Sequence, residues 1–408
     1  MSPSNKTLLP SGPLRVALLI ESSRAYGRGI LAGVTKYIRQ QGHWIVSLQE
    51  QSLCDEPPPW LESWEGDGII TRIDNRALAG CIRRLGVPVV YVRNVPPGLK
   101  APGIVTDNAT VSRMAFEHLQ ERGFRHFAYC GFNGADYSDE RRDAFAQSVE
   151  QAGLRCHVFG PDKPAAQLDT AGYEVSGLND SKQVAKWLQG LPKPIGLMAC
   201  NDMRGHQVLD ACRASNVAVP EDIAVVGVDN DELLCELSDP PLSSVVPNTE
   251  RIGYESAAQL GRLMAGERIR PQQLLVPPSA VVTRRSTDVL AIEDRQVASA
   301  ARFIREHACE GIDMSDLLRV VPVSRSTLER RYRQVTGRSP KNDILRFRLA
   351  RAKQLLAETD FPVALIAEKL GFEHTEYLNV IFKKKAGVTP AQFRARSRIA
   401  DAADRLPG

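Results

Sequence analysis

Short, continuous apolar runs alternate with amphipathic segments over residues 14 to 285. The amphipathic segments, such as 26–42 and 109–123, carry apolar residues at helical spacing. Continuous apolar strands that alternate with helices are typical of a parallel sheet covered on both faces. The pattern restarts near residues 107 and 243, which predicts two such sheets joined by more than one crossing strand. The runs with strand character are 14–20, 44–48, 68–71, 89–92, 126–131, 195–200 and 223–228.

Beyond residue 296 the apolar spacing is helical throughout. In the segment "VSRSTLERRYRQVTGRSP" (323–340), Leu328, Tyr332 and Val335 recur at i, i+4 and i+7. This spacing predicts a short helix with those three side chains inward and several arginines outward. Ser324 provides an N-cap, and the glycine and proline of "GRSP" end the helix.

A second short helix precedes this basic one. The segment "MSDLLRVVPV" (314–323) carries Leu317, Leu318 and Val321 on one side, and Pro322 lies in the connecting turn. Two short helices joined by a tight turn, the second of them basic, match a helix-turn-helix, whose second helix enters the DNA major groove.

The arrangement is repeated in residues 361–394. A short helix over 363–370 precedes a second helix, and lysines 383–385 lie at the far end of that second helix. Both units end in a Gly-x-[ST]-Pro turn, "GRSP" and "GVTP", and a longer helix over 341–360 separates them. One such unit is a weak signal, whereas two in tandem are a strong one. The residues expected inward on the second helix are Tyr377, Leu378, Ile381 and Phe382.

The charge is divided in the same way. Residues 295–408 hold 22 Lys and Arg against 13 Asp and Glu, a net charge of +9. The remaining 294 residues hold 30 against 35, a net charge of −5, and together the two parts give the overall +4. Most charged helix faces are simply solvated. A basic quarter that carries two helix-turn-helix patterns instead favours a module that binds double-stranded DNA.

Several other classes of protein are disfavoured. The first 13 residues contain one basic residue and no apolar run, so we expect no signal peptide, no membrane helix and a cytoplasmic location. The eight cysteines include no C-x-x-C pair and the seven histidines are dispersed, so we expect no disulfide framework, metal or cofactor. No P-loop, G-x-G-x-x-G or G-x-S-x-G motif is present, which argues against an enzyme acting on a sugar or sugar phosphate.

Polar residues follow the predicted strands of the first 285 residues. Because ligands of open α/β sheets bind at the carboxyl ends of strands, these residues are candidates for a binding site. Carboxylate, amide and guanidinium groups with an aromatic ring suit a neutral polyol, whose hydroxyls both donate and accept hydrogen bonds. Any one of them alone has an even chance of being an ordinary loop or cap residue. The candidates include Glu21, Arg24, Tyr26, Arg72, Arg93, Asn94, Asn201, Asp202 and Asp229.

Residues 296–397 resemble the AraC/XylS family of transcription regulators. The resemblance rests on "SRSTLERRYRQVTGRSP", "RLARAKQLL", "IAEKLGF" and "FKKKAGVTPAQFR". It implies two recognition helices in successive major grooves, although Val380 stands where the family often has a longer polar residue. Carried over by position, the base-facing residues are Ser326, Glu329, Arg330, Thr375, Glu376 and Asn379, and the phosphate-facing residues are Arg331, Arg333, Lys383 and Lys384.

Residues 14–285 resemble the sugar-binding core of LacI/GalR-type repressors and periplasmic pentose-binding proteins. The matching motifs are "DERRDAFAQSVEQAGL", "CNDMRGHQVLDACRASNVAVPEDIAVVGVDN" and "PPLSSVVPNTERIGYESAAQL". Two positions depart from the pattern: Gly27 stands where a second ring often lies, and Arg93 replaces a frequent acidic residue. The resemblance implies sugar contacts from Tyr26, Arg141, Asn201, Asp202 and Asp229.

The two resemblances together predict a periplasmic-binding-protein-like α/β sensor of two lobes, followed by an all-α domain with two helix-turn-helix units. This order is similar to the pentose-responsive members of the AraC/XylS family, which implies an activator controlled by D-xylose or a related pentose. We further expect a homodimer on promoter DNA, with RNA polymerase as a further partner. The expected boundaries are a disordered N-terminus over 1–13, the sensor over 14–285, a linker over 286–295, the DNA-binding domain over 296–397 and a tail over 398–408.

Overall fold

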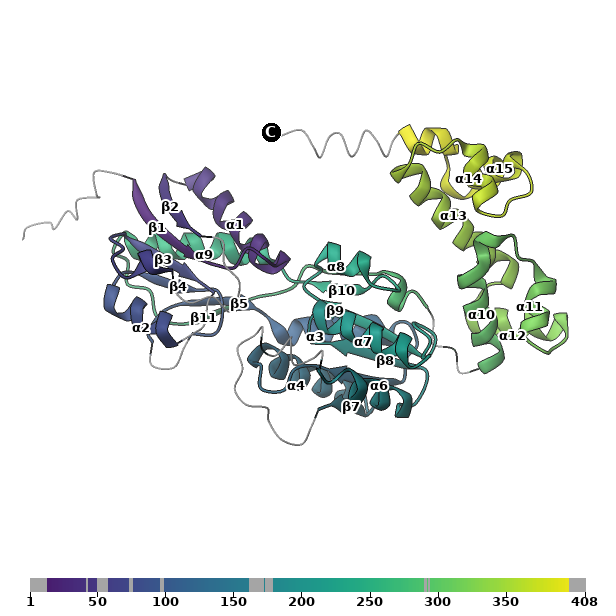
Figure 1. Ribbon diagram of the computed structural model, residues 1–408, viewed down its shortest axis with the longest axis horizontal. Coiled ribbons are helices and arrows are strands. Elements are labelled where there is room, and N and C mark those ends of the chain that lie inside the picture. Colours follow the sequence, from purple (N-terminus) through teal and green to yellow (C-terminus); the bar gives the residue numbers. More distant parts are fainter. Residues whose placement is uncertain are drawn as a thin grey trace, which may run out of the picture. The chain divides into compact units, whose positions relative to one another are not determined.

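The computed structural model of the chain divides into two compact units, Met1–Ala291 and Ile292–Gly408 (Figure 1). Residues 1–12 of the expected N-terminal segment and the whole expected tail lie outside the described residues. The residues that the structure describes are 13–41, 43–49, 58–72, 76–95, 99–160, 172, 179–289, 292 and 294–395.

The first unit contains two lobes, each built on one sheet. In lobe 1 all neighbouring strands are parallel, and the strand order is β11-β5-β4-β3-β1-β2. Helices α1 and α9 lie side by side on this sheet (Figure 1). The elements of lobe 1 are β1 (Leu14–Leu19), α1 (Ala25–Gln41), β2 (Trp44–Leu48), η1 (Pro59–Leu61), β3 (Gly68–Thr71), α2 (Arg76–Leu85), β4 (Val89–Tyr91), β5 (Gly103–Thr106), α9 (Thr249–Met264) and β11 (Gln273–Val276).

Lobe 2 repeats the architecture with the strand order β12-β10-β9-β8-β6-β7. Its neighbouring strands are parallel except for β12, which pairs antiparallel with β10. The elements of lobe 2 are α3 (Asn108–Gln120), β6 (His126–Cys130), α4 (Asp136–Gln151), β7 (Cys156–Phe159), α6 (Ser181–Gly190), β8 (Ile195–Ala199), α7 (Asp202–Ala214), β9 (Ile223–Val228), α8 (Glu232–Leu237), β10 (Ser243–Val246), β12 (Ala280–Val282) and η2 (Arg285–Thr287).

The chain passes between the lobes at three places within the described residues: after β5, after β10 and after β11. The prediction of two sheets joined by more than one crossing is therefore confirmed. The central strands are apolar along their whole length because helices cover both faces of each sheet, and all six residues of β9 are buried. The apolar pattern did not reveal β5, β7, β10, β11 and β12, which are short or lie at sheet edges.

The first unit extends beyond residue 285, where we expected the linker to begin. Ser286 and Thr287 are buried, and their hydroxyls form hydrogen bonds with the second sheet. The polar composition of "RRST" suggested an exposed connection, but hydrogen bonding allows hydroxyls to be buried. Residues 290, 291 and 293 of the expected linker lie outside the described residues.

The second unit is entirely helical in the part that the structure describes, as predicted. One apolar cluster joins α10, α11, α12 and the start of α13, and a second joins the end of α13 with α14 and α15. The long helix α13 therefore belongs to both helix-turn-helix units. The elements are α10 (Arg295–His307), η3 (Ala308–Glu310), α11 (Met314–Val320), α12 (Arg325–Thr336), α13 (Pro340–Glu358), α14 (Val363–Lys369) and α15 (Thr375–Ala386).

Local signals set the helix ends in this unit. The Ser324 hydroxyl accepts a hydrogen bond from the Thr327 amide at the start of α12. Gly337 and Gly387 end α12 and α15 in the left-handed conformation, with φ of 72° and 75°. A residue with a Cβ would be strained there, which explains the glycine of both Gly-x-[ST]-Pro turns.

Two residues that we expected inward are instead exposed. Val335 on α12 is 37% exposed and Tyr377 on α15 is 49% exposed. In both helices the core is formed by pairs at i and i+4, Leu328 with Tyr332 and Leu378 with Phe382. A short helix that packs on one side buries a narrow stripe, so the outermost apolar residues of each pattern remain at its edge.

Candidate functional site

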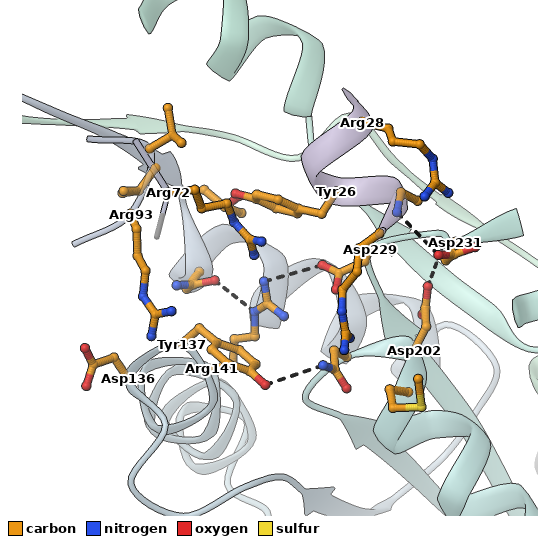
Figure 2. A pocket seen from close by; sticks show the side chains of 18 of the residues that line it. Tyr26, Arg28, Arg72, Arg93, Asp136, Tyr137, Arg141, Asp202, Asp229 and Asp231 are labelled. Carbon is orange, nitrogen blue, oxygen red and sulfur yellow. Dashed lines mark hydrogen bonds and ion pairs between the residues drawn. The ribbon is translucent and has the colours of Figure 1, made fainter. Parts of the chain in front are cut away.

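A cavity of about 730 Å³ lies at the carboxyl ends of the strands in the first unit (Figure 2). This volume is within the roughly 300–1,000 Å³ usual for small-molecule sites. Lobe 1 contributes residues such as Tyr26 and Arg72 to its lining, and lobe 2 contributes residues such as Arg141 and Asp229. All five sequence-predicted sugar contacts line the cavity: Tyr26, Arg141, Asn201, Asp202 and Asp229.

Tyr26 forms a rigid aromatic surface in lobe 1. It lies in the first turn of α1, and its hydroxyl is 2.8 Å from the Thr106 hydroxyl at the end of β5. The Arg72 guanidinium lies 4.4 Å from the ring centre, and it also pairs with the buried carboxylate of Glu21. Burial raises the pKa of the Tyr26 phenol, and Arg72 opposes that rise. The ring is therefore neutral and held from two sides.

The departure at Gly27 has a steric cause. A Cβ at this position would overlap the backbone oxygen and the carboxylate of Glu21. Helix α1 can start this close to the end of β1 because residue 27 is glycine. A second aromatic ring could not occupy this position without displacing the Glu21–Arg72 pair.

Arg141 is the central cation of lobe 2. Its side chain is 4% exposed, and its Nε donates to the Asn108 Oδ1 at 2.8 Å. A second guanidinium nitrogen donates to the Cys200 carbonyl, and a third lies 3.9 Å from the Asp229 carboxylate. Figure 2 shows Arg141 between Tyr137 and Asp229, and its guanidinium carbon is 5.4 Å from the Tyr137 ring centre. These contacts fix a positive charge at the wall of the cavity.

Asp229 follows β9 and adopts an unusual backbone conformation. Its φ is 108° and that of Asn230 is 48°, both in the region that non-glycine residues rarely occupy. The Asp229 amide donates to the Val245 carbonyl at 3.1 Å, and the Asp231 amide donates to the Asp202 carboxylate at 2.8 Å. Conformations of this kind persist where surrounding contacts hold them, and they are frequent at binding sites. The Asp229 carboxylate remains 25% exposed at the cavity.

Asn201 and Asp202 stabilise the site as well as line it. The Asn201 side chain caps α7 by accepting from the Arg204 amide, and its Nδ2 lies 3.4 Å from the Tyr137 hydroxyl. The Asp202 carboxylate accepts from the Ser244 hydroxyl at 2.6 Å and from the Asp231 amide. Burial raises the pKa of the Asp202 carboxyl to about 8, and the nearby Asp229 carboxylate adds to the rise.

In α12 of the second unit, Ser326, Arg330 and Arg333 are exposed. Glu329 is partly exposed and pairs with Arg325 at 3.0 Å. The base-facing set expected from α12 therefore lies on the accessible side of the helix, as a recognition helix requires.

Arg331, which we expected at a phosphate, has partners within its own unit. One of its guanidinium nitrogens donates to the Gln296 side-chain oxygen at 2.6 Å and lies 3.5 Å from the Asp294 carboxylate. The side chain nevertheless remains 40% exposed. It could reach a phosphate only in competition with the start of α10.

Helix α12 is fixed to α13 by a polar network. The Tyr332 hydroxyl donates to Asp343 at 2.7 Å. Arg338 and Arg346 form ion pairs with the same carboxylate. Burial, with the neighbouring Asp343 carboxylate, raises the pKa of Tyr332. The network sets the orientation of the helix that carries the first group of residues expected to face DNA.

In α15 the accessible side carries Glu376, Asn379, Lys383 and Lys384, with Thr375 partly exposed. Val380 lies among them and is 66% exposed. Leu378 and Phe382 point the opposite way into the core of the second helix-turn-helix unit. The second recognition helix thus has an apolar residue in the middle of a polar face.

Family models match three parts of the chain. They are a XylR N-terminal domain over residues 15–96, a periplasmic binding protein-like domain over 116–287 and a helix-turn-helix domain over 317–396. The xylose operon regulatory protein of Escherichia coli (strain K12) is 33% identical over a match of 393 positions that covers 93% of this chain and 96% of that protein. The chain belongs to the family of xylose operon regulatory proteins. It is a DNA-binding transcription regulator, and its relatives are regulators rather than enzymes.

Further comparisons agree over most of the chain. The xylose operon regulatory protein of Haemophilus influenzae is 31% identical and covers 93% of this chain and 98% of its own length. A solved structure of a xylose-binding transcription activator, XylR, has a TM-score of 0.76 at 31% identity and covers 94% of this chain and 98% of that chain. The CelR–cellobiose complex, at 23% identity and a TM-score of 0.52, covers 67% of this chain and 84% of that chain and shows the fold alone.

Some lining residues were not expected from the sequence. Thr106 ends β5 and Asn108 follows it; because the apolar pattern did not reveal this strand, the strand-end rule was not applied to them. Tyr137 lies one helical turn before Arg141, and this i, i+4 spacing could have identified it. Asp231 lies close to Tyr26 because its carboxylate accepts from the Ala25 amide at 3.4 Å, a contact between lobes that no local pattern encodes.

Among the described residues, no cluster of three or more His, Cys, Asp or Glu is arranged to hold a metal ion. Seven of the eight cysteines are described, and no two of them form a disulfide. Cys54 lies outside the described residues. No helix in the described part of the chain is long and apolar enough to cross a membrane.

Proposed function

We propose that this regulator is an activator whose effector is D-xylose, bound in the cavity between the lobes of the first unit. The convergence of Tyr26, Arg141, Asn201 and Asp229 on one cavity carries the proposal. The relatives' names support the choice of sugar, since they include xylose operon regulatory proteins and a xylose-binding activator. The protein acts in the cytoplasm, where promoter DNA is found.

The polar groups suit a neutral sugar with several hydroxyls. A carboxylate such as Asp229 can accept from two adjacent hydroxyls, and a guanidinium such as Arg141 can donate to one while its other nitrogens keep their protein partners. The Tyr26 ring offers an apolar surface to a sugar C–H face. Asp202 acts mainly by holding the 229–231 loop, because its oxygens already accept from Ser244 and Asp231.

Sugar binding then changes the affinity for DNA through the lobes. A ligand that contacts both lobes favours their closed arrangement, and only a difference in affinity between the two arrangements can shift the equilibrium. A tenfold preference corresponds to about 1.4 kcal/mol of coupling. The regulator acts as a homodimer, because two linked DNA-binding units multiply affinity for promoter DNA, and RNA polymerase is the partner through which it activates.

Titration calorimetry of the full chain against a panel of pentoses and hexoses tests the effector. We expect D-xylose to bind most tightly, to remain chemically unchanged, and to raise the affinity for a promoter fragment in fluorescence anisotropy. Absence of heat with every sugar, together with unaltered DNA binding, would contradict the proposal. Tighter binding of another pentose would revise only the identity of the effector.

A further inference from the structure

The last stretch of the first unit, residues 283–289, is fixed to the second sheet by buried hydroxyls. We call it the strap. The Ser286 hydroxyl donates to the Val225 carbonyl at 2.6 Å and accepts from the Ser243 amide at 2.8 Å. The Thr287 hydroxyl donates to the Ser243 hydroxyl at 2.7 Å and lies 2.8 Å from His118 Nε2. The strap therefore follows any movement of β9 and β10.

The strap is also the covalent route to the DNA-binding unit. Ile292 already belongs to the apolar core of that unit, and the Asp294 side chain caps α10. The strap is therefore the part of the first unit that comes directly before the DNA-binding unit in the sequence.

Arg284 connects the strap to the loop that holds Asp229. One of its guanidinium nitrogens donates to the Asn230 Oδ1 at 2.9 Å and to the Leu242 carbonyl at 3.1 Å. Its Nε donates to Glu236 of α8 at 2.7 Å, and its backbone amide donates to Ser243 at 2.7 Å. The side chain is only 10% exposed. Arg284 thus binds three segments around the end of β9.

Asn230 is next to the residue that we propose for sugar binding, but it does not line the cavity. Its side-chain oxygen accepts from Arg284 and its amide donates to Ser244 at 3.0 Å. Asp229 and Asn230 are adjacent and share the unusual positive φ, so a backbone rotation at Asp229 would displace Asn230. Asp229 is thus separated from Arg284 by one peptide bond and one hydrogen bond.

We propose that Arg284 is a positioning residue that couples occupation of the cavity to the DNA-binding unit, through Asn230 on one side and the strap on the other. The proposal rests on the proposed function, because it takes Asp229 as a contact of the effector. Coupling between distant sites requires an element that both sites bias, and the 229–231 loop joined to the strap is such an element.

The test compares full-length variants in operator binding with and without D-xylose, on a promoter fragment that the wild type binds. Arg284→Met removes the three side-chain hydrogen bonds and keeps an apolar stem. Asn230→Gly removes the acceptor at a position whose φ of 48° glycine tolerates, and Asn230→Asp retains an acceptor. Arg285→Met, at the exposed neighbouring arginine, is the matched control.

We expect the ratio of operator Kd without and with D-xylose to fall toward one in Arg284→Met and Asn230→Gly, and to persist in Asn230→Asp and Arg285→Met. The D-xylose Kd of Arg284→Met without DNA should stay within about threefold of the wild type. Since coupling is reciprocal, operator DNA should no longer change that Kd.

A wild-type ratio retained by both Arg284→Met and Asn230→Gly would overturn the coupling role of Arg284 and leave the proposed function standing. An equal loss of the D-xylose response in Arg285→Met would also overturn the coupling role of Arg284. The response would then depend on the positive charge of the strap and not on the contacts of Arg284. If wild-type protein shows no response to D-xylose, the proposed function fails and the inference fails with it.

Discussion

The cavity and the two recognition helices differ in how their residues are brought together and in how far these residues are exposed. Residues that line the cavity come from both lobes, and a hydrogen bond across it joins residues 206 positions apart. Several of these side chains are buried and already bonded within the protein, as Arg141 and Asp202 illustrate. The residues expected to face DNA come from two helices of 12 residues each and are largely exposed.

The difference has an energetic meaning. A cavity whose polar groups are held in place before binding loses little side-chain entropy when a small ligand enters, so a few hydrogen bonds suffice for affinity. Exposed lysines and arginines instead gain affinity by displacing counterions from phosphates, which makes binding depend on salt. Substitutions in the cavity should therefore have large effects that are specific to sugar binding. Substitutions on the DNA-binding helices should have smaller effects that are distributed over many residues.

The largest effect is expected for Asp229→Ala. Loss of two charge-assisted hydrogen bonds to the sugar, at about 1.5–3 kcal/mol each, corresponds to roughly 10²- to 10⁴-fold weaker D-xylose binding. The fold should survive, because Arg141 keeps its bonds to Asn108 and the Cys200 carbonyl. Calorimetry with D-xylose, thermal melting and operator binding without sugar provide the three measurements.

Asp143→Ala is the matched control for this variant, since Asp143 is a 70% exposed carboxylate outside the cavity and should leave the D-xylose Kd unchanged. An unfolded Asp229→Ala protein would assign Asp229 a structural role. Unchanged sugar affinity would remove it from the site.

The next largest effect is expected in the salt dependence of DNA binding. The second unit has its own apolar clusters, so residues 292–408 should fold and bind DNA without sugar. Four phosphate contacts, by Arg331, Arg333, Lys383 and Lys384, predict a slope of about −3.6 in log K against log salt, or about 150-fold weaker binding from 50 to 200 mM. A slope near −2.7 would indicate that Arg331 stays with Asp294, and binding independent of salt would exclude phosphate contacts.

The DNA-binding unit could be predicted almost completely from the sequence. Its signals are local: the N-cap at Ser324, the glycines that end α12 and α15, and the apolar stripe of α13 each lie within one helix. The errors at Val335 and Tyr377 also have a local cause, since spacing gives the direction of a side chain but not the width of the buried stripe.

The sensor could be predicted at the level of architecture, but its site only in part. Strand-end residues such as Tyr26 and Asp229 were identified because a parallel sheet brings strand ends together. The roles of Asp202 and Glu21 could not be predicted, because each depends on a partner from another segment, Ser244 and Arg72 respectively. The same holds for Ser286 and Thr287, whose burial depends on hydroxyl partners.

Two substitutions separate base contacts from phosphate contacts on the DNA face. Arg330→Ala should cost about 1–3 kcal/mol at one operator position and relax the base preference there, whereas Lys384→Ala should weaken all sequences about equally and flatten the salt slope. Anisotropy titrations on operators with single base changes measure both. Lys182→Ala, an exposed lysine of the first unit, is the control. Equal weakening at every base position by Arg330→Ala would show that Arg330 contacts phosphate.

The smallest effect distinguishes the two recognition helices from each other. Val380 projects from the polar face of α15, 66% exposed, where a branched apolar side chain can contact the C5 methyl group of thymine in the major groove. Replacing one thymine by deoxyuridine in the half-site of the second unit should then weaken wild-type binding about fourfold, the equivalent of about 0.8 kcal/mol for one buried methyl group.

Val380→Ala should bind both DNAs equally. Deoxyuridine in the half-site of the first unit should affect the wild type and Val380→Ala alike. If Val380→Ala still distinguishes thymine from deoxyuridine at every position of its half-site, Val380 makes no base contact and the second helix specifies sequence through Thr375, Glu376 and Asn379 alone.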